Sequence, residues 1–444
     1  MFARSLSSFV VGALFVADCM PVAAQTTGSA RPFHGALFGV HSAQNSTQKL
    51  DVSAMLLQAY DDNVFATLGS NVAPGSGQVS GFFNMLQPAV DYRLTHARVQ
   101  VGLTGASAMG YYPQFHELKS ISHTAGAGVA LDVARKATVF LNQTAAYSPS
   151  YLYSLFPGSI EMSPGDPAPD APNYAVNDVE SFSYGTTARF SYGLTQRMSA
   201  SVGGNYQYTD YVHETSVRQD LISHGLDGQL SYQRTRNLSF RAVYRYTAGN
   251  LSYGSTGSAD EHGLEGGISY SRPLSATRSA TFSFSLGSSA ASTISASIGP
   301  QFPDRLYRAS ADAAFDYEFA LAWRASGRYR RGFEFVPGLA QPVFTDGFSA
   351  ALEGLLKPRV EIGLMASYSQ GASALSAAAS QFNTNSASVR LQYALTSSTA
   401  IHVEYVYYFY DFLGDVTLVS GAPPRMQRNA VRAGLRLLFP AFRG

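Results

Sequence analysis

The densest group of charged side chains in this sequence lies on the two sides of one short turn at Ala320-Leu321. Three carboxylates precede the turn and three guanidinium groups follow it: Asp312, Asp316, Glu318, Arg324, Arg328 and Arg330. If both stretches are strands, side chains two residues apart share a face, so Asp316 falls near Arg324 and Asp312 near Arg328. Two interpretations stay open: a ladder of salt bridges that stiffens the wall of a barrel, or a charged constriction that selects solutes.

Further cations occur at alternating positions of other segments, between apolar neighbours. They are Arg189, Arg241, Arg245, Arg390, Arg432 and Arg436. Charges that line the lumen of a membrane barrel tune its selectivity. We therefore expect these side chains to face inward, and we predict a weak preference for anionic or hydroxyl-rich solutes.

Motifs for catalysis or metal binding were sought among the nine histidines and the single cysteine. The histidines show no pair at helical spacing and no cysteine partner, so the sequence predicts no metal site and no cofactor. His402 and Glu404 share one face of a predicted strand, which is more typical of a satisfied pair in a lumen than of a catalytic base. A Ser-His-acid set whose members meet only in space stays open, but we predict no catalytic residues.

The longest predicted connection, Ser148 to Asp178, is rich in proline and glycine. Loops of this length are usually functional or disordered. Either the loop folds into the mouth of a pore and narrows it, or it covers the rim. Calcium binding is disfavoured because Pro167 and Pro169 interrupt the ligand spacing of a known loop type. The side chains of a constriction loop would be Tyr151, Tyr153, Phe156, Glu161, Asp166 and Asp170.

The elements that must position these side chains are long alternating segments. In one of them Val403, Tyr405 and Tyr407 interleave with His402 and Glu404. A strand that crosses a bilayer needs about 9 to 11 residues, more than the 5 to 6 of a typical globular strand. Charged residues make up only 14% of the chain, and no later stretch is apolar enough for a spanning helix. The pattern predicts an all-β protein, a transmembrane antiparallel up-and-down barrel.

Short turns alternate along the chain with long connections, as in barrels of this kind. Counting strands from Asp51–Tyr60 to Ala430–Phe439 gives about 18, with 16 as the alternative because the long segment Ser279–Ile298 is hard to divide. Asn250–Asp260 is among the predicted long connections. In the last strand the predicted lipid face includes Val431 and Leu435.

The N-terminus has the pattern of an export signal. A positive Arg4 precedes an apolar core at Phe9–Ala17, and Val22-Ala23-Ala24 offers small residues for cleavage. We predict a signal peptide at 1–24, a flexible periplasmic lead at 25–49 and a barrel at 50–440. The formal net charge of +1 gives no indication of nucleic acid binding. The predicted location is the outer membrane of a Gram-negative-type bacterium.

Four short motifs resemble a known family. Tyr60-Asp61-Asp62-Asn63-Val64-Phe65 closes the first predicted strand, Leu86-Gln87-Pro88-Ala89-Val90 and Tyr111-Tyr112 follow, and Val431-Arg432-Ala433-Gly434-Leu435 opens the last. These residues resemble the putative beta-barrel porin family 2, outer-membrane barrels often associated with exopolysaccharide gene clusters. The resemblance implies a role near polysaccharide export and carries no catalytic residues. Within the rim motif Tyr60-Asp61-Asp62-Asn63, the residues Asp61, Asp62 and Asn63 are equally well explained as a turn whose side chains cap the backbone at the outer rim.

Three functional classes remain open at this level. The first is a channel or export conduit, which we prefer; the second is a structural or polysaccharide-binding barrel that conducts no ions. The third is a hydrolase embedded in a barrel. Expected partners are outer-membrane lipid, the outer-membrane insertion machinery and polysaccharide, and the oligomeric state is not determined by the sequence.

Overall fold

The computed structural model describes residues 47–63, 80–114, 119–148, 181–211, 220–251, 257–275, 277–294, 305–319, 322–335, 342–374, 381–413 and 425–443. The predicted signal peptide, nearly all of the predicted lead, and the six residues of the predicted constriction loop lie outside these ranges. Within the described residues no helix is long and apolar enough to cross a membrane.

The described chain forms 18 strands of 12 to 19 residues. The first nine are β1 (Gln48–Asp61), β2 (Gly81–His96), β3 (Val99–Tyr111), β4 (Lys119–Ala134), β5 (Ala137–Ser148), β6 (Ser181–Gly193), β7 (Met198–Tyr211), β8 (Leu221–Gln233) and β9 (Leu238–Leu251). The second nine are β10 (Gly257–Ser275), β11 (Arg278–Ile294), β12 (Leu306–Phe319), β13 (Trp323–Glu334), β14 (Val343–Lys357), β15 (Val360–Ser373), β16 (Gln381–Ala394), β17 (Thr399–Leu413) and β18 (Arg425–Arg443).

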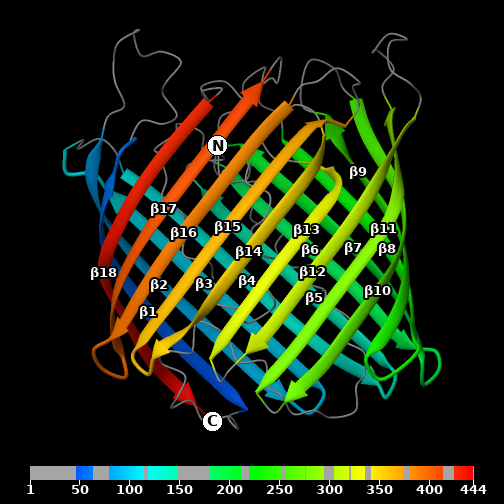
Figure 1. Ribbon diagram of the computed structural model, residues 1–444, viewed down its shortest axis with the longest axis horizontal. Coiled ribbons are helices and arrows are strands. Elements are labelled where there is room, and N and C mark those ends of the chain that lie inside the picture. The colour runs from blue at the N-terminus through cyan, green and yellow to red at the C-terminus, as the bar shows by residue number, and fades with distance from the viewer. Residues whose placement is uncertain are drawn as a thin grey trace, which may run out of the picture.

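Each strand pairs antiparallel with its neighbours in sequence, and β18 pairs with β1 to close the sheet. The closing register runs from Lys49 opposite Arg443 to Asp61 opposite Ala430. Figure 1 shows the strongly tilted strands with β1 beside β18. The predicted up-and-down barrel is therefore confirmed with 18 strands, and the alternative count of 16 is wrong. Closure pairs both edges of the sheet, which leaves no open edge to be exposed in hydrocarbon.

Several predicted boundaries differ from the structure. Ser279–Ile298 contains one long strand, β11, and Asn250–Asp260 is largely strand because the ladder of β9 and β10 extends to Leu251 opposite Gly257. The connections at 212–220 and 295–305, which join β7 to β8 and β11 to β12, were not among the predicted long connections. Composition marks turns well, but the end of a ladder depends on how far the partner strand continues.

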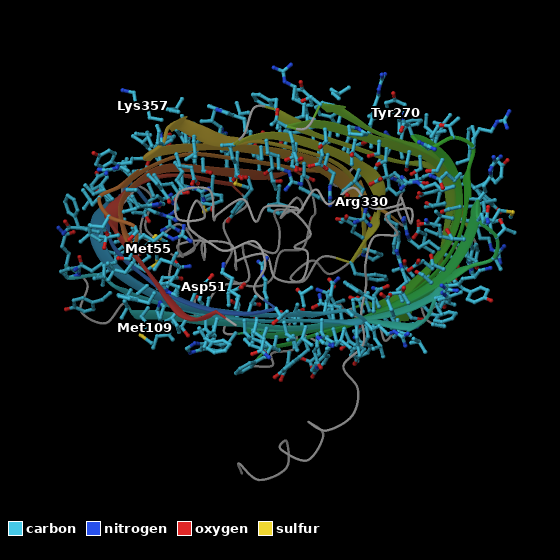
Figure 2. The ribbon with its side chains drawn as sticks, turned by 90° about the horizontal axis from the view of Figure 1, so that it is seen from below. Asp51, Met55, Met109, Tyr270, Arg330 and Lys357 are labelled. Carbon is cyan, nitrogen blue, oxygen red and sulfur yellow. The ribbon has the colours of Figure 1, made fainter. Side chains whose placement is uncertain are left out.

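The two faces of the wall differ as predicted. Apolar side chains point outward and are exposed, among them Leu56, Phe240, Val431 and Leu435. In Figure 2 Met109, Tyr270 and Lys357 project from the outside of the oval barrel, whereas Asp51, Met55 and Arg330 project into it.

Exposed aromatic rings form two outward-facing bands near the strand ends. Near the short turns lie Tyr192, Tyr232, Tyr270, Tyr393 and Phe439; near the long connections lie Tyr60, Phe82 and Tyr111. At one short turn the rings of Phe319 and Trp323 stack with their centroids 5.8 Å apart. Such bands mark the two membrane–water interfaces of outer-membrane barrels.

Candidate functional site in the barrel lumen

The predicted charge ladder lies on the inner wall at β12 and β13. Arg324 donates hydrogen bonds through Nε and Nη2 to Oδ1 of Asp316, at 3.1 and 2.7 Å. The pair is diagonal, since the register places Glu318 directly opposite Arg324 and Asp312 opposite Arg330. Arg328 is diagonal to Asp312 by the same offset. The predicted pair of Asp316 and Arg324 is thus present, whereas the partner of Asp312 is Arg241 on β9, at 3.4 Å, rather than the predicted Arg328.

The ladder continues onto β6–β10, where sequence reasoning had identified only the cations. Arg189 pairs with Asp227 at 2.8 Å, Arg245 with Glu265 at 3.2 Å, and Arg241 with Asp312 at 3.4 Å. The carboxylate partners Asp227 and Glu265 were missed. They occupy inward positions of β8 and β10. A sequence pattern alone does not give the stagger between strands, which decides which side chains lie close enough to pair.

A second group of charges lies on the wall from β14 to β18 and is buried. Arg390 lies 3.4 Å from Glu353 and 3.8 Å from Glu361, and Arg432 lies 3.2 Å from Glu404. Charges this deeply buried are stable only when they are paired and hydrogen-bonded. Arg436 lies on the same face, opposite Ala400 on β17.

The predicted pair of His402 and Glu404 belongs to this second group. Its Nε2–Oε2 distance is 3.7 Å, and Nδ1 of His402 lies 3.2 Å from the side-chain amide of Gln392. The His402 side chain is completely buried. At 3.7 Å the contact with Glu404 is too long for a hydrogen bond, and Nε2 of His402 has no hydrogen-bond partner among the described residues, so the two side chains lie close together but do not form the predicted satisfied pair.

The rim motif closes the barrel. Arg428 on β18 donates a hydrogen bond of 2.7 Å from Nε to Oδ2 of Asp61, and both side chains are buried. Asn429 donates from its backbone N and from Nδ2 to the Asp62 carboxylate, at 2.7 and 2.6 Å. Asn63 donates from Nδ2 to the Gln427 carbonyl at 2.9 Å. We call these contacts the seam latch, because they join the two ends of the chain across the seam of β1 and β18.

The phenol of Tyr112 packs beside the seam latch. Its ring lies 5.1 Å from that of Phe83, and it belongs to a buried cluster on the inner faces of β1 to β3. Burial raises the pKa of Tyr112, while Arg428 opposes the shift. The phenol is therefore neutral at physiological pH. Tyr60, the first residue of the motif, points outward and packs against Phe82, with ring centroids 5.2 Å apart.

The outer ends of β13 and β14 leave the wall and turn into the barrel. The ladder between β12 and β13 ends at Ala311 opposite Arg331, whereas β13 continues to Glu334. Phe333 and Phe344 then pack against Ala259 and Ala291 of strands that are not their neighbours in the sheet. Figure 2 shows this ribbon curving inward near Arg330. We call residues 332–335 and 342–346 the inner flap.

The inner flap is held by cations as well as by apolar contacts. The guanidinium of Arg308 lies 5.1 Å from the centre of the Phe344 ring and donates to the Ser373 carbonyl at 3.2 Å. Arg331 lies 5.6 Å from the same ring and donates to the Ala309 carbonyl at 3.2 Å. The flap narrows the outer half of the lumen, and its Glu334 lies 3.4 Å from Arg330 on β13. Nothing in the sequence pattern had predicted it.

Within the described part of the chain, no cluster of three or more histidine, cysteine or acidic side chains is arranged to hold a metal ion. The described inner wall presents charged and hydrogen-bonding side chains.

The fold and the lumen define the class of the molecule: a closed β-barrel with an apolar outer face and a charged, hydrogen-bonding inner face. This arrangement is the one expected of a barrel that crosses an outer membrane.

No protein-family model matches the chain, so the resemblance to the putative beta-barrel porin family 2 is not confirmed. No curated protein sequence matches it either. Among solved structures it is similar to Pseudomonas aeruginosa OpdQ, at 12% identity and a TM-score of 0.41 over 89% of this chain and 98% of that one. Acinetobacter baumannii OccAB3 is similar at 11% identity and a TM-score of 0.40, over 88% and 99% of the two chains. Pseudomonas aeruginosa OccK5 (OpdH) has 13% identity and a TM-score of 0.40, over 88% and 98%. Similarity at this level does not assign a function.

Proposed function

We propose that the protein is a porin-type channel of the outer membrane of a Gram-negative-type bacterium, and that it conducts small polar solutes. The observation that carries this proposal is the segregation of side chains. Apolar residues face outward along the closed sheet, and the ladder from Arg189 to Arg330 faces inward. A barrel of 16 to 18 strands is wide enough to leave an aqueous channel.

We further propose a weak preference for anions. Most lumen arginines are matched by carboxylates, which limits any net field. Yet several cations are more exposed to the lumen than their partners: 46% against 17% for Arg330 and Glu334, and 37% against 7% for Arg245 and Glu265. At these two pairs an anion in the lumen meets the guanidinium group before it meets the carboxylate.

The proposal is tested by reconstitution into planar lipid bilayers. Folded protein, identified by heat-modifiable migration in a gel, is expected to give discrete conductance steps, and a KCl gradient gives the reversal potential. Boiled protein is the matched control. Folded protein that inserts, as shown by protease protection in vesicles, but gives no conductance would contradict the proposal.

A second candidate is a structural or polysaccharide-binding barrel that conducts no ions. It is favoured by the inner flap and by the buried apolar cluster on the inner faces of β1 to β3, which both occupy space inside the wall. The same bilayer measurement separates the two, because only this candidate gives an inserted barrel without conductance. Either candidate is compatible with a contribution to exopolysaccharide export, which we propose only on the resemblance of the short motifs at residues 60–65 and 431–435. Its test is whether deleting the gene lowers secreted polysaccharide.

A further inference from the structure

One part of the inner wall is polar without being charged. It spans β5 to β8, and its cross-strand rows follow from the register. One row contains Thr144, Gly185, Gln207 and Ser223; the next contains Asn142, Thr187, Asn205 and Gly225. Among these described positions every side chain is a hydroxyl, an amide or a glycine hydrogen. We call the two rows the neutral patch.

Two glycines of the neutral patch make room for polar side chains of the neighbouring strands. A Cβ atom built on Gly185 would lie 2.7 Å from Oγ1 of Thr144, and one built on Gly225 would collide with Oδ1 of Asn205. The threonine and the asparagine therefore lie across the neighbouring strand, in space that any larger residue would fill. A cavity of about 250 Å³ lies beside these side chains, and its lining includes Thr144, Thr187, Asn205 and Gln207.

The polar groups of the patch are open to a ligand. Thr144 and Asn205 are exposed to the lumen. In the part of the chain that the structure describes, the side chains of Thr144, Thr187, Asn205 and Gln207 make no hydrogen bond with one another or with other side chains. Each hydroxyl or amide both donates and accepts, so the patch offers both kinds of group over a small area.

The nearest charges below the patch neutralise each other. In the row below, Arg189 lies opposite Gly203, which lies opposite Asp227. The Arg189 guanidinium and the Asp227 carboxylate join across Gly203 at 2.8 Å. A Cβ atom on Gly203 would lie 2.5 Å from Oδ1 of Asp227, so this glycine makes the pair sterically feasible. An ion therefore gains little at the patch, whereas a neutral polyhydroxylated molecule can exchange its water contacts for hydroxyl and amide groups.

We propose that the neutral patch is a binding subsite for an uncharged sugar unit in transit through the lumen. The cavity is slightly smaller than the roughly 300 to 1,000 Å³ typical of sites for drug-sized ligands, which fits one sugar ring rather than a longer segment. Vicinal hydroxyls on such a ring both donate and accept, which matches the alternating hydroxyls and amides of the two rows. The inference deepens the proposed channel function and depends on it for access from solution.

The test uses maltotriose as a neutral probe on reconstituted channels. Wild-type channels are expected to show brief, concentration-dependent current interruptions from which a half-saturation concentration is obtained. The variant Thr144→Val/Thr187→Val/Asn205→Leu/Gln207→Met keeps side-chain volume but removes the hydrogen-bonding groups. We expect its half-saturation concentration to rise at least about tenfold, with the reversal potential in KCl unchanged.

The matched control changes charge instead of neutral groups. The double variant Arg324→Gln/Asp316→Asn changes the charged wall at β12 and β13, away from the neutral patch, and should leave maltotriose binding unchanged. Heat-modifiable migration establishes that each variant folds; should the quadruple variant not fold, Asn205→Leu/Gln207→Met replaces it. Channels that conduct but whose current is insensitive to maltotriose would overturn the subsite while leaving the channel function intact. If no channel conducts, the channel proposal fails, and saturation-transfer NMR of maltotriose with detergent-solubilised protein decides the subsite alone.

Discussion

The seam latch gives the sharpest prediction, because the same substitution can be made at a buried and at an exposed ion pair. We expect Asp61→Asn to destabilise the barrel strongly and Asp316→Asn to change its stability little. Both carboxylates accept hydrogen bonds from an arginine on another strand, Asp61 from Arg428 and Asp316 from Arg324. The two pairs differ chiefly in their exposure to solvent.

The expected magnitudes follow from that exposure. The side chains of Arg428 and Asp61 are 2% and 0% exposed, whereas those of Arg324 and Asp316 are 46% and 38% exposed. Removing one partner of a buried pair leaves the other charge in a low-dielectric environment and typically costs about 3 to 5 kcal/mol. An exposed pair is screened by water and contributes roughly 0 to 1 kcal/mol. The difference between the two variants should therefore exceed about 2 kcal/mol.

The assay is urea unfolding in lipid vesicles, followed by the fluorescence of the single tryptophan, Trp323. A third variant, Asp61→Asn/Arg428→Met, removes both buried charges and should recover part of the loss, since an apolar replacement of a buried pair is often well tolerated. Equal free energies of unfolding for Asp61→Asn and Asp316→Asn would refute the claim that burial gives the seam latch its strength.

Three further predictions concern the lumen and the lipid face. Replacing Arg324, Arg328 and Arg330 together with Gln removes three positive charges and leaves the neighbouring carboxylates in place. The reversal potential in a KCl gradient should therefore move toward the equilibrium potential of K⁺, and an unchanged reversal potential would contradict the proposed anion preference. Phe344→Ala removes the ring that the Arg308 and Arg331 guanidinium groups contact, and it should raise the single-channel conductance by loosening the inner flap. An unchanged conductance would show that the narrowest point of the lumen lies elsewhere. Trp323 should be quenched by lipids brominated near the headgroup more than by lipids brominated near the chain end, and the reverse order would contradict its interfacial position.

Much of the wall could be predicted from the sequence because side-chain direction in a strand is a local property. The alternation around Val431 and Leu435 was enough to predict which side chains face lipid. Turn composition was enough to separate neighbouring strands, and the pair Asp316 and Arg324 was predictable because only a short turn separates the two strands. Pairings between strands further apart, such as Arg241 with Asp312, were not predictable, since they depend on the stagger of β9 to β12.

The sequence by itself determined an all-β chain with one apolar and one polar face per strand, since each strand carries its own period of two. Only the tertiary structure decided the seam latch, the inner flap and the neutral patch. The latch joins residues 367 positions apart, the flap rests on strands that are not its neighbours, and the patch needs glycines of one strand beside long side chains of the next. Each depends on barrel closure and strand register, which are properties of the whole sheet and cannot be derived from the sequence of any single strand.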